Sequence, residues 1–335
     1  MFFKKNKDKI AILGSGSFGS ALSIVLAEKF DVILWGINPE IINEINTKKT
    51  NNFYLEDARF PENVFATLNI ENIRNCDTIV FAVPSSATRE VATKAKPFIN
   101  KKAIVVSAAK GLEETTGYRM SQVLNSILPN PVVVISGPSH AEELAAGIPT
   151  SVVAASRSNK YALKIQKEFS SKVLRVYSSK DVIGVELGGV LKNIIAIAAG
   201  INSGLGLGVN SQAALITRGL VEIVRFGISM KAKKETFLGL SGIGDLIVTA
   251  TSSLSRNWTL GYKIGQGKTL EEALAEMKMV CEGVKTTQVV YPIALKNKID
   301  MPITEQIYKV LFERKNPKEA VKDLMTRSLK EEKII

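Results

Sequence analysis

A glycine-rich segment near the start of the chain has the spacing of a phosphate-binding turn. Gly14, Gly16 and Gly19 form a GxGxxG pattern that directly follows an apolar run and opens a helical segment. In such turns the first glycine permits a tight bend, the second lets the backbone approach a pyrophosphate, and the third allows close helix packing. Free N–H groups at the helix start then bind the phosphates. A purely structural turn shares this spacing, but the strand–turn–helix context favours dinucleotide binding.

A single lysine in the second half of the chain could carry proton transfer. Lys192 is the only charged residue between Glu186 and Arg218, and a pair of glycines precedes it by one helical turn. Burial of an ammonium group lowers its pKa toward neutrality, which suits a general acid or base. The alternative is a lysine that reaches from an apolar helix to water. The two glycines indicate a close backbone approach and favour the catalytic interpretation.

Further polar groups follow apolar runs in the first half, where the ligands of parallel sheets bind. Ala82–Ser85 ends one run with a Pro-Ser turn, Lys110 follows the next, and Gly137 and Ser139 follow a third. Lys110 is either a solvated lysine or a group that faces the ligand. Gly137 and Ser139 could offer an N–H and a hydroxyl to an anion. We interpret His140, the only histidine, as a surface group at a helix start.

Two sites in the second half could hold an anionic substrate. Asp245 follows a Gly-rich turn, where it could pair with Lys192, hold a substrate hydroxyl, or cap the next helix. Ser255, Arg256 and Asn257 directly precede another helical segment. A hydroxyl, a guanidinium, an amide and helix N–H groups together favour a phosphate cradle. The alternative there is an N-cap followed by a surface arginine.

The elements that must position these groups change character near residue 182. In residues 1–182, Val- and Ile-rich runs alternate with amphipathic segments, as in a doubly wound parallel sheet buried on both faces. The expected strands are Ile10–Leu13, Val32–Trp35, Thr78–Val83, Ala103–Ser107, Val132–Ile135, Ser151–Ala154 and Leu174–Tyr177, with helices at Phe18–Lys29, Thr88–Ala95, Gly117–Ser126 and Tyr161–Phe169. The pattern predicts an α/β, Rossmann-like dinucleotide-binding domain.

Residues 183–335 show helical periodicity and no strand-like runs, which predicts an all-helical domain for substrate and catalysis. The expected helices are Gly184–Ala199, Ala213–Met230, Thr259–Gly265, Thr269–Met277, Thr286–Lys296, Thr304–Phe312 and Pro317–Leu324. The length of 335 residues also suits two domains.

Composition narrows the functional classes. Cys76 and Cys281 lie far apart, which excludes a disulfide scaffold and fits a reducing cytoplasm, and one histidine leaves no His-rich metal site. The net charge of +12 could attract nucleic acid, an anionic membrane surface or an anionic small molecule. The lysines are scattered without interleaved aromatics, which argues against nucleic acid. The first nine residues lack the apolar core of a signal peptide, and the uncharged stretch Ile194–Thr217 is too polar for a membrane span.

Over roughly Lys9 to Met325 the chain resembles the bacterial-type NAD(P)-dependent glycerol-3-phosphate dehydrogenases. Besides the glycine turn, the matching segments are Trp35-Gly36, Ala109–Glu113, Ser136–Ser139, Leu191–Ala196, Ala213–Gly219, Gly242–Asp245 and Ser255–Asn257. The resemblance implies that the enzyme interconverts dihydroxyacetone phosphate and sn-glycerol 3-phosphate with NAD or NADP. The glycerol 3-phosphate would supply the backbone of phospholipids.

The resemblance also implies a role for individual residues. Lys192 would be the proton acceptor in glycerol 3-phosphate oxidation. The implied substrate contacts are Lys110, Gly137, Ser139, Lys192, Asp245, Ser255, Arg256 and Asn257, and the implied cofactor contacts beyond the three glycines are Ser17, Phe18, Lys110, Ala141, Arg256, Val280 and Glu282.

The chain departs from the family pattern at a few positions. Around Ile37, at the end of the second expected strand, there is neither an acidic residue for a ribose diol nor an arginine for a 2′-phosphate. The choice between NAD and NADP therefore stays open. Ser203, Val209 and Gln212 stand where Asp, Asp and Lys are common, which bears on local packing.

Two rival functions remain at this point. One is another dehydrogenase of the same architecture, such as a 3-hydroxyacid dehydrogenase acting on a carboxylate. The other is a non-catalytic protein that senses nucleotides or binds nucleic acid. We expect a small-molecule substrate, no nucleic acid and no stable membrane anchor, and we leave a homodimer open.

Overall fold

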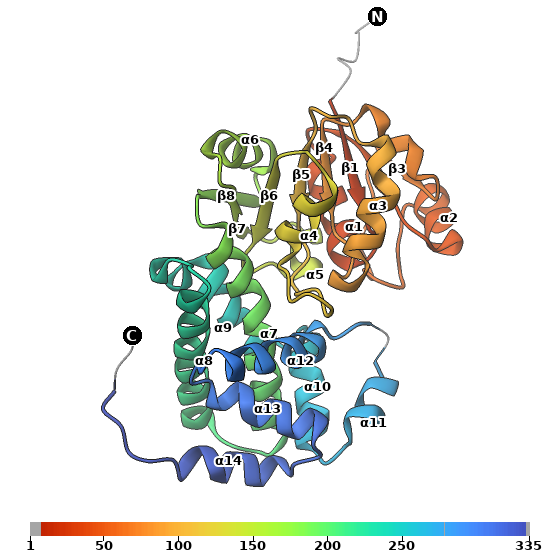
Figure 1. Ribbon diagram of the computed structural model, residues 1–335. Helices are drawn as coiled ribbons and strands as arrows, with labels where there is room; N and C mark the ends of the chain where they lie inside the picture. Colours follow the sequence, from red (N-terminus) through yellow and green to blue (C-terminus); the bar gives the residue numbers. More distant parts are fainter. Residues whose placement is uncertain (1–7, 278, 333–335) are drawn as a thin grey trace, which may run out of the picture. The chain divides into compact units, whose positions relative to one another are not determined.

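The computed structural model describes residues 8–277 and 279–332, which form two compact units (Figure 1). Unit 1 comprises Met1–Ala109 and Met120–Val182, and unit 2 comprises Lys110–Arg119 and Ile183–Ile335. The sequence analysis placed residues 110–119 in the first domain, whereas they pack with unit 2. Most of the N-terminal segment that we examined for a signal peptide lies outside the described residues.

Unit 1 contains an eight-stranded sheet in the order β3-β2-β1-β4-β5-β6-β7-β8. Its strands are β1 Lys9–Leu13, β2 Asp31–Trp35, β3 Val64–Thr67, β4 Thr78–Phe81, β5 Ile104–Ser107, β6 Val132–Ser136, β7 Thr150–Ala155 and β8 Leu174–Ser179. Seven of the eight correspond to the expected runs. The strand order reverses on the two sides of β1, as in a doubly wound fold.

The expectation of a wholly parallel sheet is wrong at one place. β7 runs antiparallel to β6, and β8 then runs parallel to β7, so the last two strands point opposite to the other six. A strand buried on both faces has the same Val- and Ile-rich composition in either direction, so composition could not reveal the reversal. β3 and the helix before it, Pro39–Lys48, were not predicted from the sequence.

Helices cover both faces of this sheet, which places an apolar core on each side. The alternation along β1 divides its residues, since Ile10 and Ile12 belong to one core and Ala11 and Leu13 to the other. The helices are α1 Ser17–Leu26, α2 Pro39–Lys48, α3 Thr88–Ala95, α4 Met120–Ile127, α5 Ala141–Ala145 and α6 Asn159–Phe169, with short 3₁₀ turns at Ile70–Asn75, Ser85–Ala87 and Lys96–Phe98.

In the described part of unit 2, every named element is helical. The elements are α7 Val182–Gly204, α8 Val209–Ser229, α9 Asp245–Thr251, α10 Arg256–Gly265, α11 Leu270–Ala275, α12 Glu282–Lys296, α13 Pro302–Phe312 and α14 Pro317–Met325, with η4 Lys234–Leu238 and the single π turn η5 Leu240–Gly244 before α9. The predicted fold class, a Rossmann-like sheet followed by a helical domain, is confirmed.

The central helix of unit 2 is α7, whose residues supply much of its apolar core. By length and composition α7 could cross a membrane, but 94% of its most apolar window is buried inside the protein. That burial is the property of a core helix. It also sets the environment of Lys192, which lies midway along α7.

Candidate active site

The glycine turn between β1 and α1 needs glycine at two of its three positions. Gly14 has φ +120°, and a Cβ there would lie 2.6 Å from the carbonyl oxygen of Ala82. A Cβ on Gly19 would lie 1.9 Å from the carbonyl oxygen of Gly14, so α1 closes directly onto the turn. A Cβ on Gly16 would meet nothing within 4 Å. Open space above Gly16 is what close approach of a ligand to the backbone requires.

The start of α1 lies near the other predicted cofactor group of unit 1. Gly16 is the N-cap of α1 and makes no side-chain cap bond, and Ser17 and Phe18 form the first turn. α5, which begins at Ala141, packs against α1. Backbone N–H groups at a helix start, beside an open glycine, fit the phosphates of a dinucleotide.

The turn after β6 carries the predicted substrate groups of unit 1. Gly137 has φ +150°, and a Cβ there would lie 2.9 Å from the Cα of Val152. The hydroxyl of Ser139 donates to the carbonyl oxygen of Gly137 at 2.9 Å, which closes the turn just before α5. The turn therefore requires glycine for conformation and contact, and its role toward a substrate stays a prediction.

The end of β2 is polar only at Asn38. Its side-chain oxygen accepts from the backbone N–H of Glu40 at 2.9 Å and of Ile41 at 3.4 Å, so Asn38 is the N-cap of α2. The Asn-Pro pair is the signal that could have revealed this helix. Ile37 beside it is 78% exposed.

In unit 2 a close contact of two backbones brings the predicted catalytic groups together. A Cβ on Gly188 would lie 2.1 Å from the carbonyl oxygen of Ser241, so only glycine allows α7 to approach the turn before α9 this closely. Lys192 follows Gly188 by four residues, and Asp245 follows Ser241 by four. The helical repeat therefore places both side chains near this contact, as the glycine pair had indicated.

Lys192 and Asp245 form a buried ion pair there. The Lys192 Nζ donates to Asp245 Oδ1 and also to the Thr249 hydroxyl at 2.6 Å, and the Thr249 hydroxyl donates to the Asp245 carbonyl oxygen at 2.6 Å. Of the three interpretations left open for Asp245, the structure shows the pairing with Lys192. Sequence reasoning missed Thr249, although its spacing of four residues from Asp245 on α9 was a usable signal.

A second ammonium group completes the cluster. The Lys110 Nζ lies 2.8 Å from Asp245 Oδ2, so one buried carboxylate holds two lysines. Burial lowers the pKa of Lys192 to about 7, the Asp245 charge opposes that change, and the Lys110 charge adds to it. A lysine side chain with a pKa near neutrality can give a proton as the ammonium and take one as the neutral amine at physiological pH. Lys110 is thus a member of the cluster rather than a solvated surface lysine.

The predicted phosphate cradle lies at the N-terminus of α10. Ser255 is the N-cap and accepts from the backbone N–H of Trp258 at 3.3 Å. Asn257 accepts from the N–H of Gly283 on α12 at 2.9 Å and donates to Asn193 Oδ1 on α7 at 3.0 Å. These two side chains fix helix ends in place, which the sequence analysis did not foresee for Asn257. Their contact with a substrate stays a prediction.

Arg256 connects this helix end to the predicted cofactor residues of unit 2. Its guanidinium donates to the carbonyl oxygen of Val280 at 3.2 Å, and the thiol of Cys281 lies 3.6 Å from its backbone oxygen. Glu282 begins α12 directly after. The structure therefore brings Arg256, Val280 and Glu282 into one neighbourhood, as a shared role at the cofactor would require.

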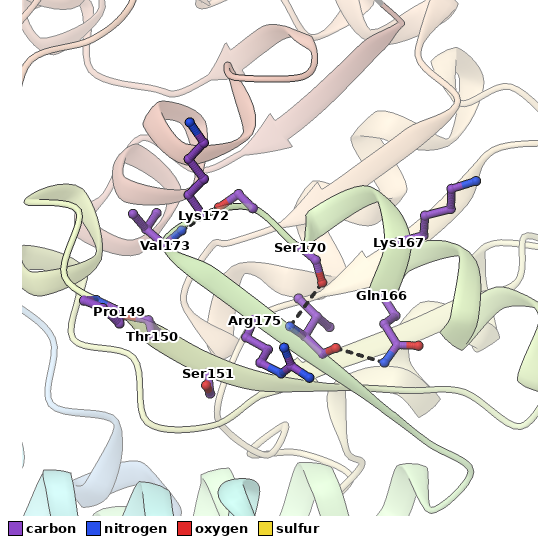
Figure 2. Close-up of a pocket in the computed structure, with 11 residues that line it drawn as sticks. Pro149, Thr150, Ser151, Gln166, Lys167, Ser170, Lys172, Val173 and Arg175 are labelled. Atoms are coloured by element: carbon purple, nitrogen blue, oxygen red, sulfur yellow. Dashed lines mark hydrogen bonds between the residues drawn. The ribbon is translucent and has the colours of Figure 1, made fainter.

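One hollow in unit 1 contains none of the predicted site residues. This hollow of about 540 Å³ lies between the starts of β7 and β8 and the end of α6. None of the predicted site residues lines it, and Figure 2 shows that its lysines, Lys167 and Lys172, do not converge. Gln166 and Ser170 instead bond the outer backbone edge of β8 at Val176. In residues 8–277 and 279–332, no group of three His, Cys, Asp or Glu side chains could hold a metal ion.

Comparison with known proteins decides the family. Residues 9–162 match the model of the NAD-dependent glycerol-3-phosphate dehydrogenase N-terminus, and residues 181–322 match that of the C-terminus. The chain belongs to the NAD-dependent glycerol-3-phosphate dehydrogenase family. The resemblance seen in the sequence is thereby confirmed, as is the dependence on NAD or NADP that defines the family.

Relatives match this dehydrogenase over nearly its full length. It is 49% identical over 329 residues to the glycerol-3-phosphate dehydrogenase [NAD(P)+] of Carboxydothermus hydrogenoformans, covering 97% of this chain and 98% of that protein. It is 49% identical over 330 residues to the Staphylococcus aureus enzyme of the same name, covering 97% and 99%. The crystal structure of glycerol-3-phosphate dehydrogenase from Coxiella burnetii matches with a TM-score of 0.92 and 40% identity, covering 96% of this chain and all 100% of that one.

Proposed function

We propose that this dehydrogenase interconverts dihydroxyacetone phosphate and sn-glycerol 3-phosphate with NAD(P)H. The observation that carries the proposal is the buried cluster of Lys192, Asp245 and Lys110, with the Lys192 pKa near neutrality. Reduction of a ketone to an alcohol needs a proton donor for the oxygen and positive charge beside it. Both are present in one cluster, and the family relationship supplies the substrate class.

The two parts of the chain have separate tasks in this proposal. Unit 1 is the dinucleotide-binding domain, with Gly14, Gly16, Ser17, Phe18 and Gly19 at the phosphates. Unit 2, which includes residues 110–119, is the helical substrate and catalytic domain. The open space above Gly16 and the glycine conformation of Gly14 support the first assignment.

Lys192 acts as the general acid when the ketone is reduced. A nicotinamide cofactor, when bound, would supply the hydride for the carbonyl carbon. Protonated Lys192 gives its proton to the oxygen, and the nearby Lys110 ammonium stabilises the negative charge that develops there. Asp245 holds both ammonium groups, and neutral Lys192 takes the proton back when the alcohol is oxidised.

The phosphate of the substrate is held at the start of α10. Arg256 and the N–H groups of the first turn would bind it, with Ser255 and Asn257 fixing the helix end. Gly137 and Ser139 are the substrate contacts that the family resemblance implies for unit 1. Holding the phosphate orients the ketone, so binding energy far from the reacting carbon serves catalysis.

The proposal extends to the place of this reaction in the cell. The product, glycerol 3-phosphate, supplies the backbone of phospholipids, and we place the enzyme in the cytoplasm without a membrane anchor or nucleic-acid partner. Two cysteines, both buried and unpaired, support a reducing compartment. Analytical ultracentrifugation would measure whether the enzyme is a homodimer.

An absorbance assay tests the function directly. Purified protein should oxidise NADH or NADPH when dihydroxyacetone phosphate is added. A panel of 3-keto acids tests the rival dehydrogenase, and a salt titration on DNA tests nucleic-acid binding. Turnover of a keto acid without turnover of dihydroxyacetone phosphate would refute the proposal.

A further inference from the structure

The chain leaves unit 1 after Ala109, packs with unit 2 over Lys110–Arg119, and returns at Met120. We call Lys110–Arg119 the crossing loop. It is closed on itself, because Leu112 and Arg119 form an antiparallel bridge and the N–H of Glu113 donates to the Tyr118 carbonyl oxygen at 2.9 Å. Leu112 belongs to the apolar core of unit 2. The loop is therefore a folded part of unit 2 that carries Lys110 at its first position.

Three ion pairs fix the crossing loop to the helices. Lys110 pairs with Asp245 on α9, Glu114 pairs with Lys285 on α12 at 2.6 Å, and Arg119 pairs with Glu186 on α7. They differ in burial. The side chains of Glu114 and Lys285 are 44% and 36% exposed, whereas those of Arg119 and Glu186 are 11% and 3% exposed.

A buried ion pair is a poor source of stability but a strong constraint on geometry. Removing two charges from water costs about as much as their attraction returns, so such pairs are explained better by what they position. Glu186 precedes Gly188 by two residues and Lys192 by six on α7. Arg119 is bridged to Leu112, two residues after Lys110. The pair thus joins the helix that carries Lys192 to the loop that carries Lys110.

We propose that Arg119 and Glu186 are positioning residues of the reaction, whose buried ion pair holds the crossing loop against α7 and so keeps the Lys110 ammonium on Asp245 beside Lys192. This inference rests on the proposed function. It assigns a task to two residues whose ion pair lies outside the Lys192–Asp245–Lys110 cluster. It also explains why the loop closes onto its own C-terminal residue.

Loss of the pair should have an electrostatic consequence at Lys192. The charged groups acting on Lys192 are Asp245 on α9 and Lys110 in the crossing loop, while Glu186 on its own helix is bonded to Arg119. The Lys110 charge lowers the pKa of Lys192. If the loop shifts and Lys110 leaves Asp245, this repulsion weakens and the pKa of Lys192 rises.

The test compares Glu186→Gln and Arg119→Lys with Glu114→Gln, the matched control on the exposed pair of the same loop. We expect Glu186→Gln to lower kcat/KM for dihydroxyacetone phosphate by about 10- to 100-fold, the loss typical of misplaced catalytic groups. The midpoint of the pH profile should move to higher pH. Arg119→Lys should keep part of the activity, because the charge remains but the guanidinium fork does not. Glu114→Gln should behave as wild type.

A second readout separates this inference from the proposed function. NMR of protein labelled at the lysine Cε carbons reports the pKa of Lys192 without substrate, once its signal is assigned by its loss in Lys192→Met. An upward pKa shift in Glu186→Gln supports the inference even if dihydroxyacetone phosphate proves not to be the substrate. Should Glu186→Gln fail to fold, Arg119→Lys carries the same measurement. A lower Tm with an unchanged Lys192 pKa in the folded variants would show a merely structural pair and overturn the inference.

Discussion

Replacement of Lys192 by methionine is the sharpest test of the mechanism. Methionine has a similar length but no proton to transfer, and Lys192 is only 6% exposed, so water has little access to replace it. A positioned general acid contributes about 10²- to 10⁴-fold to rate. We therefore expect Lys192→Met to lower kcat by about 10²-fold or more, with little change in the Kd of NADH.

The fold should tolerate this substitution better than most changes to a buried charge. Asp245 keeps the Lys110 ammonium at 2.8 Å, so the carboxylate is not left without a cation. The variant should therefore be obtained folded, which circular dichroism checks. Lys285→Met removes an exposed lysine of the same unit and serves as the control.

The pH dependence gives an independent signature of the same residue. Burial places the pKa of Lys192 at about 7. Ketone reduction needs the ammonium form, so kcat/KM should fall about tenfold per pH unit above that value, and alcohol oxidation should lose rate below it. Both limbs should be absent from the residual activity of Lys192→Met.

The shifted pKa of Lys192 also makes the free energy of unfolding depend on pH. The folded pKa of about 7 lies below the ordinary lysine value of 10.5, so between these pH values the unfolded chain binds more protons at this site. The free energy of unfolding therefore rises with pH across that window and loses this contribution as pH falls through 7. Lys192→Met should remove that rise. Near-normal kcat in folded Lys192→Met, with both pH limbs retained, would refute the role of Lys192.

Three further predictions follow from other parts of the chain. Arg256→Ala should raise KM for dihydroxyacetone phosphate and lower kcat, because a charge-assisted bond to phosphate contributes about 1.5–3 kcal/mol. The loss of kcat/KM should be much smaller with dihydroxyacetone, which lacks the phosphate. An equal loss on both substrates would contradict the phosphate cradle. Wild type should use NADH and NADPH without strong discrimination, and Ile37→Arg should shift kcat/KM toward NADPH; a wild-type preference above about 10³-fold would point to a residue not yet identified. Glu222 accepts from the N–H of Ile303 at 2.6 Å and of Thr304 at 3.0 Å, and burial raises its pKa to about 7 from 4.5, so its contribution to stability should fall as pH rises from 4.5 to 7. Glu222→Gln should flatten Tm over that range, and an unchanged slope would contradict this.

Local sequence signals were sufficient for most of the fold. Continuous Val- and Ile-rich runs revealed seven strands because buried strands need apolar side chains on both faces. β3 was missed because, unlike β4 and β5 of the same length, it has an exposed residue, Phe65, and no continuous buried run. The direction of β7 depends on how its connections pack, which no local pattern records.

A candidate site residue could be predicted only where its type is unusual for its surroundings in the sequence. Lys192 stood out because an ammonium group in an apolar helix demands a partner, and the glycines before it required a close neighbour. Thr249 did not stand out, because a threonine four residues along a helix is commonplace. Asn257 was assigned to a phosphate, but its amide also joins three helices through Asn193 and Gly283.

The crossing loop shows most clearly why the site could not be read completely from the chain. Lys110 comes soon after β5, and the rule that ligands lie at the carboxyl ends of strands marked it as a candidate functional lysine. That rule says nothing about the residues after it, which leave unit 1 and fold onto the helices of unit 2. Lys110 is held by Asp245, which lies 135 residues away in the sequence, and the loop that carries it is joined to α7 by the ion pair of Arg119 and Glu186. The position of the Lys110 charge in this enzyme therefore depends on ion pairs between residues far apart in the sequence. Variants of those pairs will distinguish residues that position the catalytic groups from residues that transfer the proton.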